Sequence, residues 1–375
     1  MVISYPLMGG IQEISARVGL VTGRGLAGNL RAHFPRGVLY GVIALLVLAN
    51  TINLGADIGA MAAALELMVG GPQILYIVGF GLLCLLLQVF VPYHRYVPYL
   101  KWLCLALFAY VGILFVVKIS WVSVFKATFL PHIKLSRESL TAIVAILGTT
   151  ISPYLFFWQA SQEVEEQQIN PAESALKDAP GQGENQLGRM QFDTWIGMAF
   201  SNLVAFFIIL TAAVVLHAHG VKDIQTSSQA AEALRPVAGR FAFLLFSLGI
   251  IGSGLLAVPV LAGSSAYAVG EARRWSVGLE KRPDAAKGFY AVIVVSTLVG
   301  VVLNMVHLDP IKALFWSAVV NGVVAAPIMV MIMLLASRRK VMGTFRLPLR
   351  LKLLGWGATL VMAAVTMAML ATLGR

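Results

Sequence analysis

The chain alternates long apolar stretches with short polar segments. Five stretches contain no Asp, Glu, Lys or Arg and are each longer than the roughly 20 residues that cross the hydrocarbon core of a bilayer. Because lipid offers no hydrogen-bond partners to a backbone, such stretches must be helices. The uncharged stretches are residues 139–162, 194–216, 241–270, 313–337 and 353–374.

The whole pattern predicts about ten membrane-crossing helices and therefore an all-α polytopic membrane protein. Helix breakers mark several joins, among them Gly70-Gly71-Pro72 and Asp309-Pro310. The polar segment 163–189 predicts a mobile loop, whose acids either attract cations or are simply solvated. The predicted spans run roughly over 1–20, 37–68, 73–92, 98–118, 138–165, 190–217, 240–271, 285–306, 311–338 and 350–373.

Composition and charge support this class. Of the 375 residues 59% are apolar and 12% charged, against roughly a quarter charged in a soluble domain. The net charge of +11 does not indicate nucleic-acid binding, because Lys and Arg lie between apolar spans, where lipid headgroups and orientation explain them. Loops after the odd spans hold 19 of the 28 basic residues, which predicts that these loops are cytoplasmic. We expect a multi-pass protein of the cell membrane, specifically a bacterial inner membrane.

Nothing in the sequence predicts catalysis or a permanently bound cofactor. The chain contains no nucleophile elbow, no phosphate loop and no hydrolase carboxylate pair. Cys84 and Cys104 lie inside apolar spans and are interpreted as packing residues. His217 and His219 form an HxH pattern at the end of a span, which we interpret as interfacial rather than as a metal site.

A polar interruption, Gly148-Thr149-Thr150-Ile151-Ser152-Pro153-Tyr154, lies inside the fifth span. Pro153 cannot donate a backbone hydrogen bond, so the carbonyls near Thr149 and Thr150 should lose their partners. Free oxygen atoms at membrane depth are tolerated only beside protein, water or an ion, which is how transporters form midplane sites. An ordinary proline kink, relieved by Ser and Thr hydroxyls, is an equally good interpretation.

Asp57 is the only acidic residue between Gly37 and Leu65, in the second span. A carboxylate at this depth costs about 3 kcal/mol on insertion scales, so such residues usually face a polar path for ions or protons. Asn50 and Asn53 lie seven and four residues earlier and share its helical face. Asn321, in the ninth span, either lines the same cavity or makes an interhelical hydrogen bond.

Two other patterns predict packing. Glu13 and Arg17 are spaced i, i+4 and should pair with each other. The seventh span is rich in small residues, which usually permit close contact between membrane helices. Those residues are Gly249, Gly252, Gly254, Gly263, Ser264 and Ser265.

Three stretches resemble the Nramp family of proton-coupled divalent metal transporters. Residues 11–27 are similar to the second family helix and the loop after it, 53–57 to the third helix, and 148–154 to the Met-Pro-His break of the sixth. The likeness extends over essentially the whole chain. It implies the LeuT-like inverted-repeat fold, in which two five-helix halves cross the membrane in opposite senses.

This resemblance implies a domain organisation. Residues 1–137 form an incomplete first repeat, 138–338 the second repeat, and 350–373 an extra C-terminal helix. The family's first helix, with its Asp-Pro metal-binding motif, would then be absent, and the charge orientation independently favours a helix before Met1. We expect the upstream reading frame to encode it.

Departures from the family pattern bear on the ion. The family methionine corresponds to Ser152, the adjacent histidine to Tyr154 and a later histidine to Gln159. Oxygen ligands favour hard Mg²⁺, whereas a thioether favours soft transition metals. The chain therefore resembles the magnesium-transporter branch of the family. We expect Thr149 and Ser152 to contact the metal.

The resemblance and the polar pattern together define the remaining hypothesis. Asp57, Asn53, Tyr154, Gln159 and Asn321 are candidate proton-handling or pathway residues, and Gly148 and Pro153 form the helix break. The substrate is a divalent cation of the Mg²⁺ or Mn²⁺/Fe²⁺ class, and the surrounding partner is the lipid bilayer.

Two alternatives remain open at this point. One is a cation-coupled amino-acid transporter of the same fold, and the other is a truncated membrane protein that does not transport. The sequence does not indicate an oligomeric state.

Overall fold

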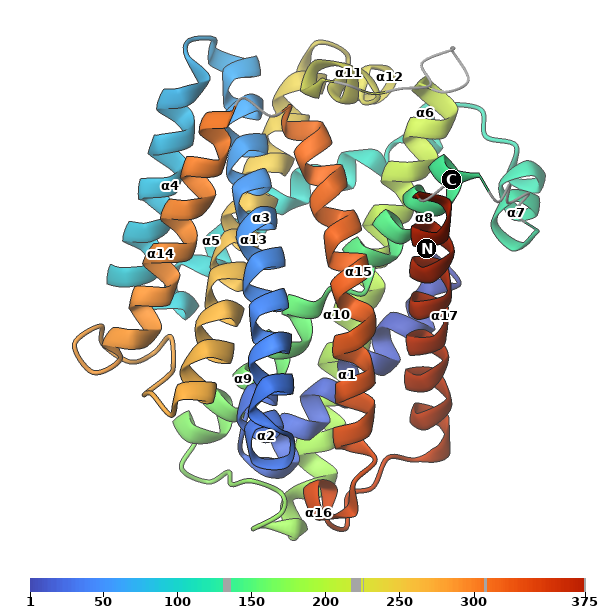
Figure 1. Cartoon of the computed structure of the whole chain (residues 1–375). Helices are drawn as coiled ribbons and strands as arrows, with labels where there is room; N and C mark the ends of the chain where they lie inside the picture. The colour runs from blue at the N-terminus through green and yellow to red at the C-terminus, as the bar shows by residue number, and fades with distance from the viewer. Residues whose placement is uncertain (131–135, 217–223, 225, 307–308, 374–375) are drawn as a thin grey trace.

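The structure is a computed structural model that describes residues 1–375 except 131–135, 217–223, 225, 307–308 and 374–375. Within the described residues all regular secondary structure is helical, and the long helices stand roughly side by side in one bundle (Figure 1). Seven helical segments of this described part are long and apolar enough to cross a membrane. His217 and His219, which we interpreted as interfacial, lie outside the described residues.

Each predicted span coincides with one or more observed helices, and a short helix, α2, lies between the first two spans. The bounds are α1 Ser4–Thr22, α2 Leu26–His33, α3 Arg36–Val69, α4 Gln73–Phe90, α5 Tyr93–Cys104, α6 Ile113–Val116, α7 Trp121–Phe129, α8 Arg137–Thr150, α9 Pro153–Ile169, α10 Gly183–Thr211, α11 Ser227–Glu232, α12 Arg235–Ala238, α13 Ala242–Arg273, α14 Lys287–Leu303, α15 Pro310–Ala336, α16 Arg339–Met342 and α17 Leu349–Leu373.

The fourth predicted span is not one helix. α5 begins before it, continues as a 3₁₀ turn over Leu105–Tyr110 and is followed by the single turn of α6. The helix α5 also contains Pro98, which the sequence suggested as a helix start. Proline is tolerated in membrane helices because neighbouring groups satisfy the backbone that it frees.

The prediction of a loop over 163–189 was wrong at both ends. α9 continues to Ile169 and α10 begins at Gly183, so only residues 170–182 connect them. Glu163 is therefore a buried helix residue, with 6% of its surface exposed. In the connecting segment Glu173 accepts hydrogen bonds of 2.7 and 3.0 Å from Arg189, and these bonds lower the pKa of the Glu173 carboxyl.

The helix α3 lies at the centre of the bundle, where it contacts α13, α14 and α15. Two large apolar clusters surround it, one built mainly on α1 and α15 and the other on α13 and α14. Tyr154, at the start of α9, packs against both clusters. The broken helix pair α8 and α9 therefore lies where the two parts of the core meet.

Small residues allow the closest helix contacts, as the sequence predicted for α13. A side chain added at Gly254 would meet Met61 of α3 at 2.5 Å. Among the described glycines the closest approach to a facing backbone joins α8 to α15, where a Cβ atom at Gly148 would lie 2.0 Å from the Ala318 carbonyl. Gly148 thus lies inside α8 as a packing residue, and its carbonyl accepts the Ser152 hydroxyl at the end of that helix.

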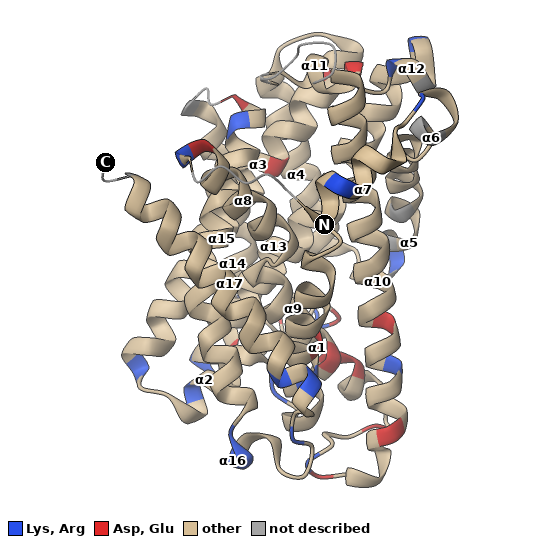
Figure 2. Cartoon of the chain, turned by 90° about the vertical axis from the view of Figure 1, so that its right-hand side faces the viewer, with Lys and Arg blue, Asp and Glu red and all other residues tan. Residues whose placement is uncertain are grey.

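The two ends of the bundle differ in charge. Lys and Arg gather at the end that holds α2 and α16 (Figure 2). The loops after the odd predicted spans lie at this end, including the connections α9–α10 and α13–α14 (Figure 1). The arrangement agrees with the orientation inferred from the sequence, in which this end faces the cytoplasm.

Replacing Gly148 with Ala should destabilise the protein, because the backbone of α15 cannot move away from the new methyl group. Overpacking of this kind costs about 1–3 kcal/mol. We expect a lower midpoint of thermal unfolding in detergent. Gly197→Ala in α10 is the matched control, because its Cβ atom would meet nothing within 4 Å. Equal midpoints for the two variants would contradict the close contact.

Candidate ion site

The fifth span is broken between α8 and α9. Ile151 and Ser152 leave the helical conformation, with φ/ψ of −113°/67° and −89°/132°, and Pro153 begins α9. Proline at a first helical position is favourable because no hydrogen bond is required of its nitrogen there. The break predicted from Pro153 is present, displaced by about one turn from Gly148.

The backbone oxygen atoms at the break are only partly satisfied. Ser152 is 1% exposed, and its hydroxyl donates to the carbonyls of Gly148 at 2.6 Å and Thr149 at 3.1 Å. The carbonyls of Thr150 and Ile151 accept no hydrogen bond from a described residue. Because each carbonyl oxygen has two lone pairs, that of Thr149 also retains one. The structure therefore agrees in part with both interpretations of the sequence. The Ser152 hydroxyl relieves the break, as in an ordinary proline kink, and the Thr150 and Ile151 carbonyls remain without a described hydrogen-bond donor, as an ion site requires.

The two candidate metal ligands differ in position. Ser152 is buried at the break, whereas the Thr149 side chain is exposed and its hydroxyl donates to the Ile146 carbonyl at 2.9 Å. Only the backbone carbonyl of Thr149 is therefore near the break, as the hypothesis requires.

The helix α15 packs against α8 and carries polar groups, one of which bonds to α3. Gly322 of α15 touches the backbone of Gly148, and its neighbour Asn321 is 2% exposed. The Asn321 Oδ1 atom has no hydrogen-bond partner among the described residues. One turn earlier on α15, the Ser317 hydroxyl donates to Asn53 Oδ1 on α3 at 2.8 Å. The buried amide oxygens of Asn50, Gln88 and Asn202 share this condition, and Asn321 differs from them in lying beside Gly322, which contacts α8 near the break.

Asp57 lies one turn beyond Asn53 on α3 and is half-buried. Its carboxylate makes no hydrogen bond or ion pair with the described residues, yet it is close enough to Tyr154 and Cys84 to act on both electrostatically. No described Lys or Arg neutralises it. An uncompensated carboxylate at this depth is costly, so it is suited to holding a proton or facing a cation.

Asn50, which shares one face of α3 with Asn53 and Asp57, has a packing role. Its amide donates to the Leu261 carbonyl and to the Ser264 and Ser265 hydroxyls of α13, at 3.1, 2.7 and 3.0 Å. Three bonds from one buried amide join α3 to α13. On this face of α3, Asn50 therefore packs against α13, whereas Asn53 faces α15 and Asp57 faces α9.

Gln159 does not join this group. It accepts from the Gln12 amide at 3.4 Å and donates to Glu163 at 2.7 Å, which places it in a polar chain between α1 and α9. Gln12 also donates to the Leu155 carbonyl at 3.1 Å, just after the break. Sequence reasoning overlooked Gln12 and Glu163 as members of this chain, although Gln12 is a polar residue inside an apolar span.

A buried ion pair on α1 lies beside that chain. Arg17 donates to Glu13 at 3.1 Å, and their side chains are 8% and 0% exposed. Glu13 also accepts from Gln191 and from the Trp195 indole, both at 2.8 Å. The predicted i, i+4 pair is confirmed, and it joins α1 to α10.

The site offers oxygen donors and little else. Among the described residues no group of three His, Cys, Asp or Glu side chains is placed to hold a metal ion. The donors near the break are carbonyls, the Ser152 hydroxyl, amide oxygens and the single carboxylate of Asp57. Such a set suits hard cations, which bind to carbonyl, carboxylate and water oxygens.

Comparison with known proteins supports the resemblance. The model of the family described as "Natural resistance-associated macrophage protein-like", or Nramp, matches residues 1–372. The chain is 26% identical over 364 residues to "Divalent metal cation transporter MntH" of Burkholderia ambifaria, covering 94% of the chain and 76% of that protein. A protein of the same name from Xanthomonas campestris pv. campestris is 26% identical over 253 residues, which cover 65% of the chain and 54% of that relative.

The fold is also found in a solved structure. A crystal structure of the Eremococcus coleocola manganese transporter, in complex with an aromatic bis-isothiourea substituted compound, matches with a TM-score of 0.77 and 19% identity. The match covers 99% of the chain and 78% of that structure. At this identity the likeness shows the fold, which is the expected LeuT-like transporter fold. The named relatives are transporters and not enzymes, as expected.

Replacing Glu13 with Ala should destabilise the protein strongly, because Arg17 would remain buried without its partner. Breaking a buried pair in this way costs about 3–5 kcal/mol. The expected result is a large fall in the thermal midpoint in detergent, with partial recovery in Glu13→Leu/Arg17→Met. As a control, Glu232→Ala removes an exposed pair with Arg235 and should cost under about 1 kcal/mol. A Glu13→Ala variant as stable as this control would show that the buried pair does not stabilise the fold.

Proposed function

The chain belongs to the Nramp family, and from this membership we propose that it is a secondary transporter that moves a divalent metal cation across the cell membrane. The observation that carries the proposal is the break between α8 and α9, where two backbone carbonyls accept no hydrogen bond from the described residues. These oxygen atoms can coordinate a cation that passes through the bundle, because no existing hydrogen bond has to be broken first. The multi-pass helical fold agrees with this function, and we place the protein in a bacterial inner membrane.

We further propose that the preferred ion is Mg²⁺. The break carries Ser152, and no thioether or imidazole is contributed by residues 148–154. Mg²⁺ keeps several water molecules and interacts with oxygen groups. The Ser152 hydroxyl and the Thr149, Thr150 and Ile151 carbonyls would contact the ion or its waters, with Asn321 on the facing helix.

Coupling to protons rests on Asp57. It is an acidic residue on α3 that has no compensating charge among the described residues, and Tyr154, next to Ser152 and Pro153 in the chain, feels its charge. A carboxylate that gains and loses a proton as the ion passes would link the two movements. The site contains no histidine to share this role among residues 148–163.

The alternative of an amino-acid transporter receives no support from the relatives, whose names specify divalent metal cations. A protein that does not transport remains the second candidate. A protein of that kind would give no ion flux in proteoliposomes, either as the wild type or as any variant, which separates it from a transporter.

Replacing Ser152 with Ala should lower Mg²⁺ uptake into proteoliposomes by about tenfold or more, because a hydrogen-bonding group at a charged site contributes about 1.5–3 kcal/mol. Ser152→Met should instead shift the ratio of fluxes toward Mn²⁺. The matched control is Ser253→Ala in α13, whose hydroxyl also donates to its own helix, at 3.1 Å. Strong Mn²⁺ transport that survives Ser152→Ala, without any Mg²⁺ flux, would contradict the oxygen-lined site.

Replacing Asp57 with Asn should abolish the proton movement that accompanies metal uptake, because an amide side chain does not gain or lose a proton at the pH of the assay. The measurement is acidification inside proteoliposomes that contain a pH-sensitive dye, with metal flux recorded in parallel. Glu66→Gln, near the end of the same helix α3, is the control and should leave the signal unchanged. An Asp57→Asn variant with unaltered metal-driven acidification would exclude this role.

A further inference from the structure

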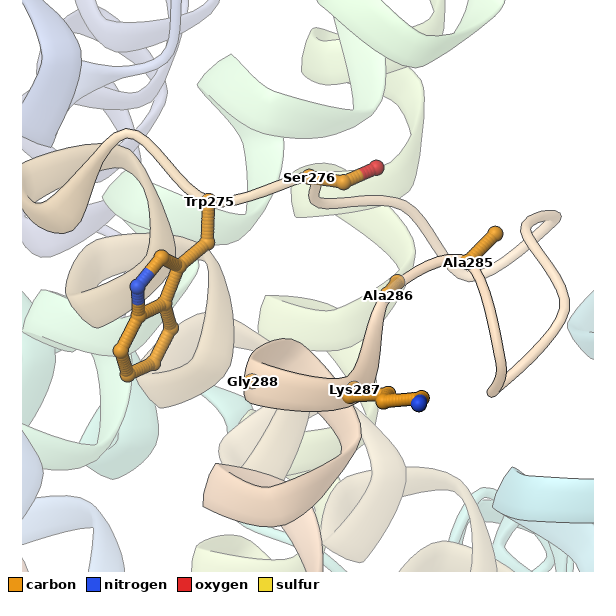
Figure 3. A pocket seen from close by; sticks show the side chains of 6 residues that line it. All are labelled: Trp275, Ser276, Ala285, Ala286, Lys287 and Gly288. Atoms are coloured by element: carbon orange, nitrogen blue, oxygen red, sulfur yellow. The ribbon is translucent and has the colours of Figure 1, made fainter.

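A cavity of about 200 Å³ opens at the cytoplasmic end of the bundle, between the end of α13 and the start of α14 (Figure 3). Its size far exceeds the roughly 10–15 Å³ that one water molecule needs. The cavity belongs to no part of the ion site described above. Its lining residues are Trp275, Ser276, Ala285, Ala286, Lys287 and Gly288.

Trp275 forms one wall of the cavity, and its position requires a residue without a side chain at Gly288. A Cβ atom at Gly288 would lie 2.5 Å from a carbon of the Trp275 ring, so any larger residue would push the indole away. The residue Trp275 is nevertheless 42% exposed. A half-exposed indole at a helix end is typical of the level where lipid headgroups meet the hydrocarbon.

The other wall carries an unpaired cation. Lys287 lines the cavity on the side opposite Ser276 and is exposed, without an ion pair to any described residue, while the Ser276 hydroxyl oxygen accepts from Lys281 Nζ at 3.2 Å (Figure 3). Segment 273–287 contains five basic residues and two acidic ones. One of the acids, Asp284, pairs with Arg282 at 3.6 Å, which leaves the region with excess positive charge.

The backbone places a further cation next to the Trp275 wall. Arg274 ends α13 in the left-handed conformation, with φ of 61°, and is the one non-glycine residue with positive φ among those described. Glycine is the usual residue at this position, so an arginine here is disfavoured by backbone conformation alone. The turn is closed by the Trp275 amide, which donates to the Gly270 carbonyl at 2.8 Å.

Beyond the cavity, α14 presents an apolar surface toward the membrane. Val295, Leu298, Val299 and Val302 are between 44% and 59% exposed. Acyl chains can therefore follow the helix while a headgroup stays at its cytoplasmic end. Basic pockets between membrane helices on this side are a known way to hold anionic headgroups.

From these observations we propose that the cavity binds the phosphate headgroup of an anionic phospholipid from the cytoplasmic leaflet. Lys287 supplies the opposing charge, Ser276 a hydroxyl for the phosphate oxygens, and Trp275 the interfacial wall. The exposed apolar face of α14 commits the site to a lipid in preference to free phosphate. The inference is independent of which ion the protein carries.

The test is native mass spectrometry of the purified protein after exposure to mixed micelles of phosphatidylglycerol and phosphatidylcholine. Lys287→Gln should weaken phosphatidylglycerol retention about fivefold, the effect expected for one basic residue near anionic lipid. Ala285→Phe should also weaken retention, because it fills the cavity without altering the charge. Arg350→Gln is the control, since it removes an equal charge from an exposed site at the same end of the bundle.

Thermal unfolding in lipid-free detergent checks that the variants are folded. Phosphatidylglycerol should then raise the midpoint of the wild type and of Arg350→Gln more than that of the two cavity variants. Equal losses of retention in Arg350→Gln and Lys287→Gln would overturn the proposal in favour of diffuse charge. Retention unaffected by Ala285→Phe, or an equal stabilisation by inorganic phosphate without lipid, would overturn it as well.

Discussion

The break of the fifth span at Ile151 and Ser152 is the constraint from which the rest of the site follows. A helix that stops inside a bilayer leaves carbonyl oxygens that water cannot reach, and each must find another partner. Here the Ser152 hydroxyl takes two of them, and those of Thr150 and Ile151 accept no bond from the described residues. Apolar core residues flank the break, among them Leu147 and Ile151, and the amides of α3 and α15 lie on helices packed nearby.

Close packing keeps this polar region from collapsing. Gly148 and Gly322 bring the backbones of α8 and α15 together, which fixes the end of α8 against the helix that carries Asn321. Asn50 fastens α3 to α13 through three hydrogen bonds. On the other side of the break, the chain from Gln12 through Gln159 to Glu163 connects α9 to α1. The break is thus held by α15 on its α8 side and by α1 on its α9 side.

Much of the fold could be predicted because lipid permits few alternatives. Long uncharged stretches must be helices, and Pro153 must interrupt one of them. The extent of α9 was missed because Glu163, Glu165 and Glu166 resemble a solvated segment, whereas Glu163 is buried against Gln159. The contact of Gly148 with α15 could not be predicted, because it depends on which backbone faces this glycine. Sequence spacing placed Asn50, Asn53 and Asp57 on one face but could not tell which helix each residue meets.

The central claim is that a divalent cation is held by backbone oxygens at the break. Anomalous diffraction from crystals of the protein grown with Mn²⁺, as a substitute that is visible beside lighter atoms, would test it most directly. The account predicts an anomalous peak next to Ser152 and the Thr150 and Ile151 carbonyls, at about 2–2.6 Å or separated by one water. A map in which α8 and α9 form one continuous helix, or in which the peak lies away from these oxygens, would contradict it.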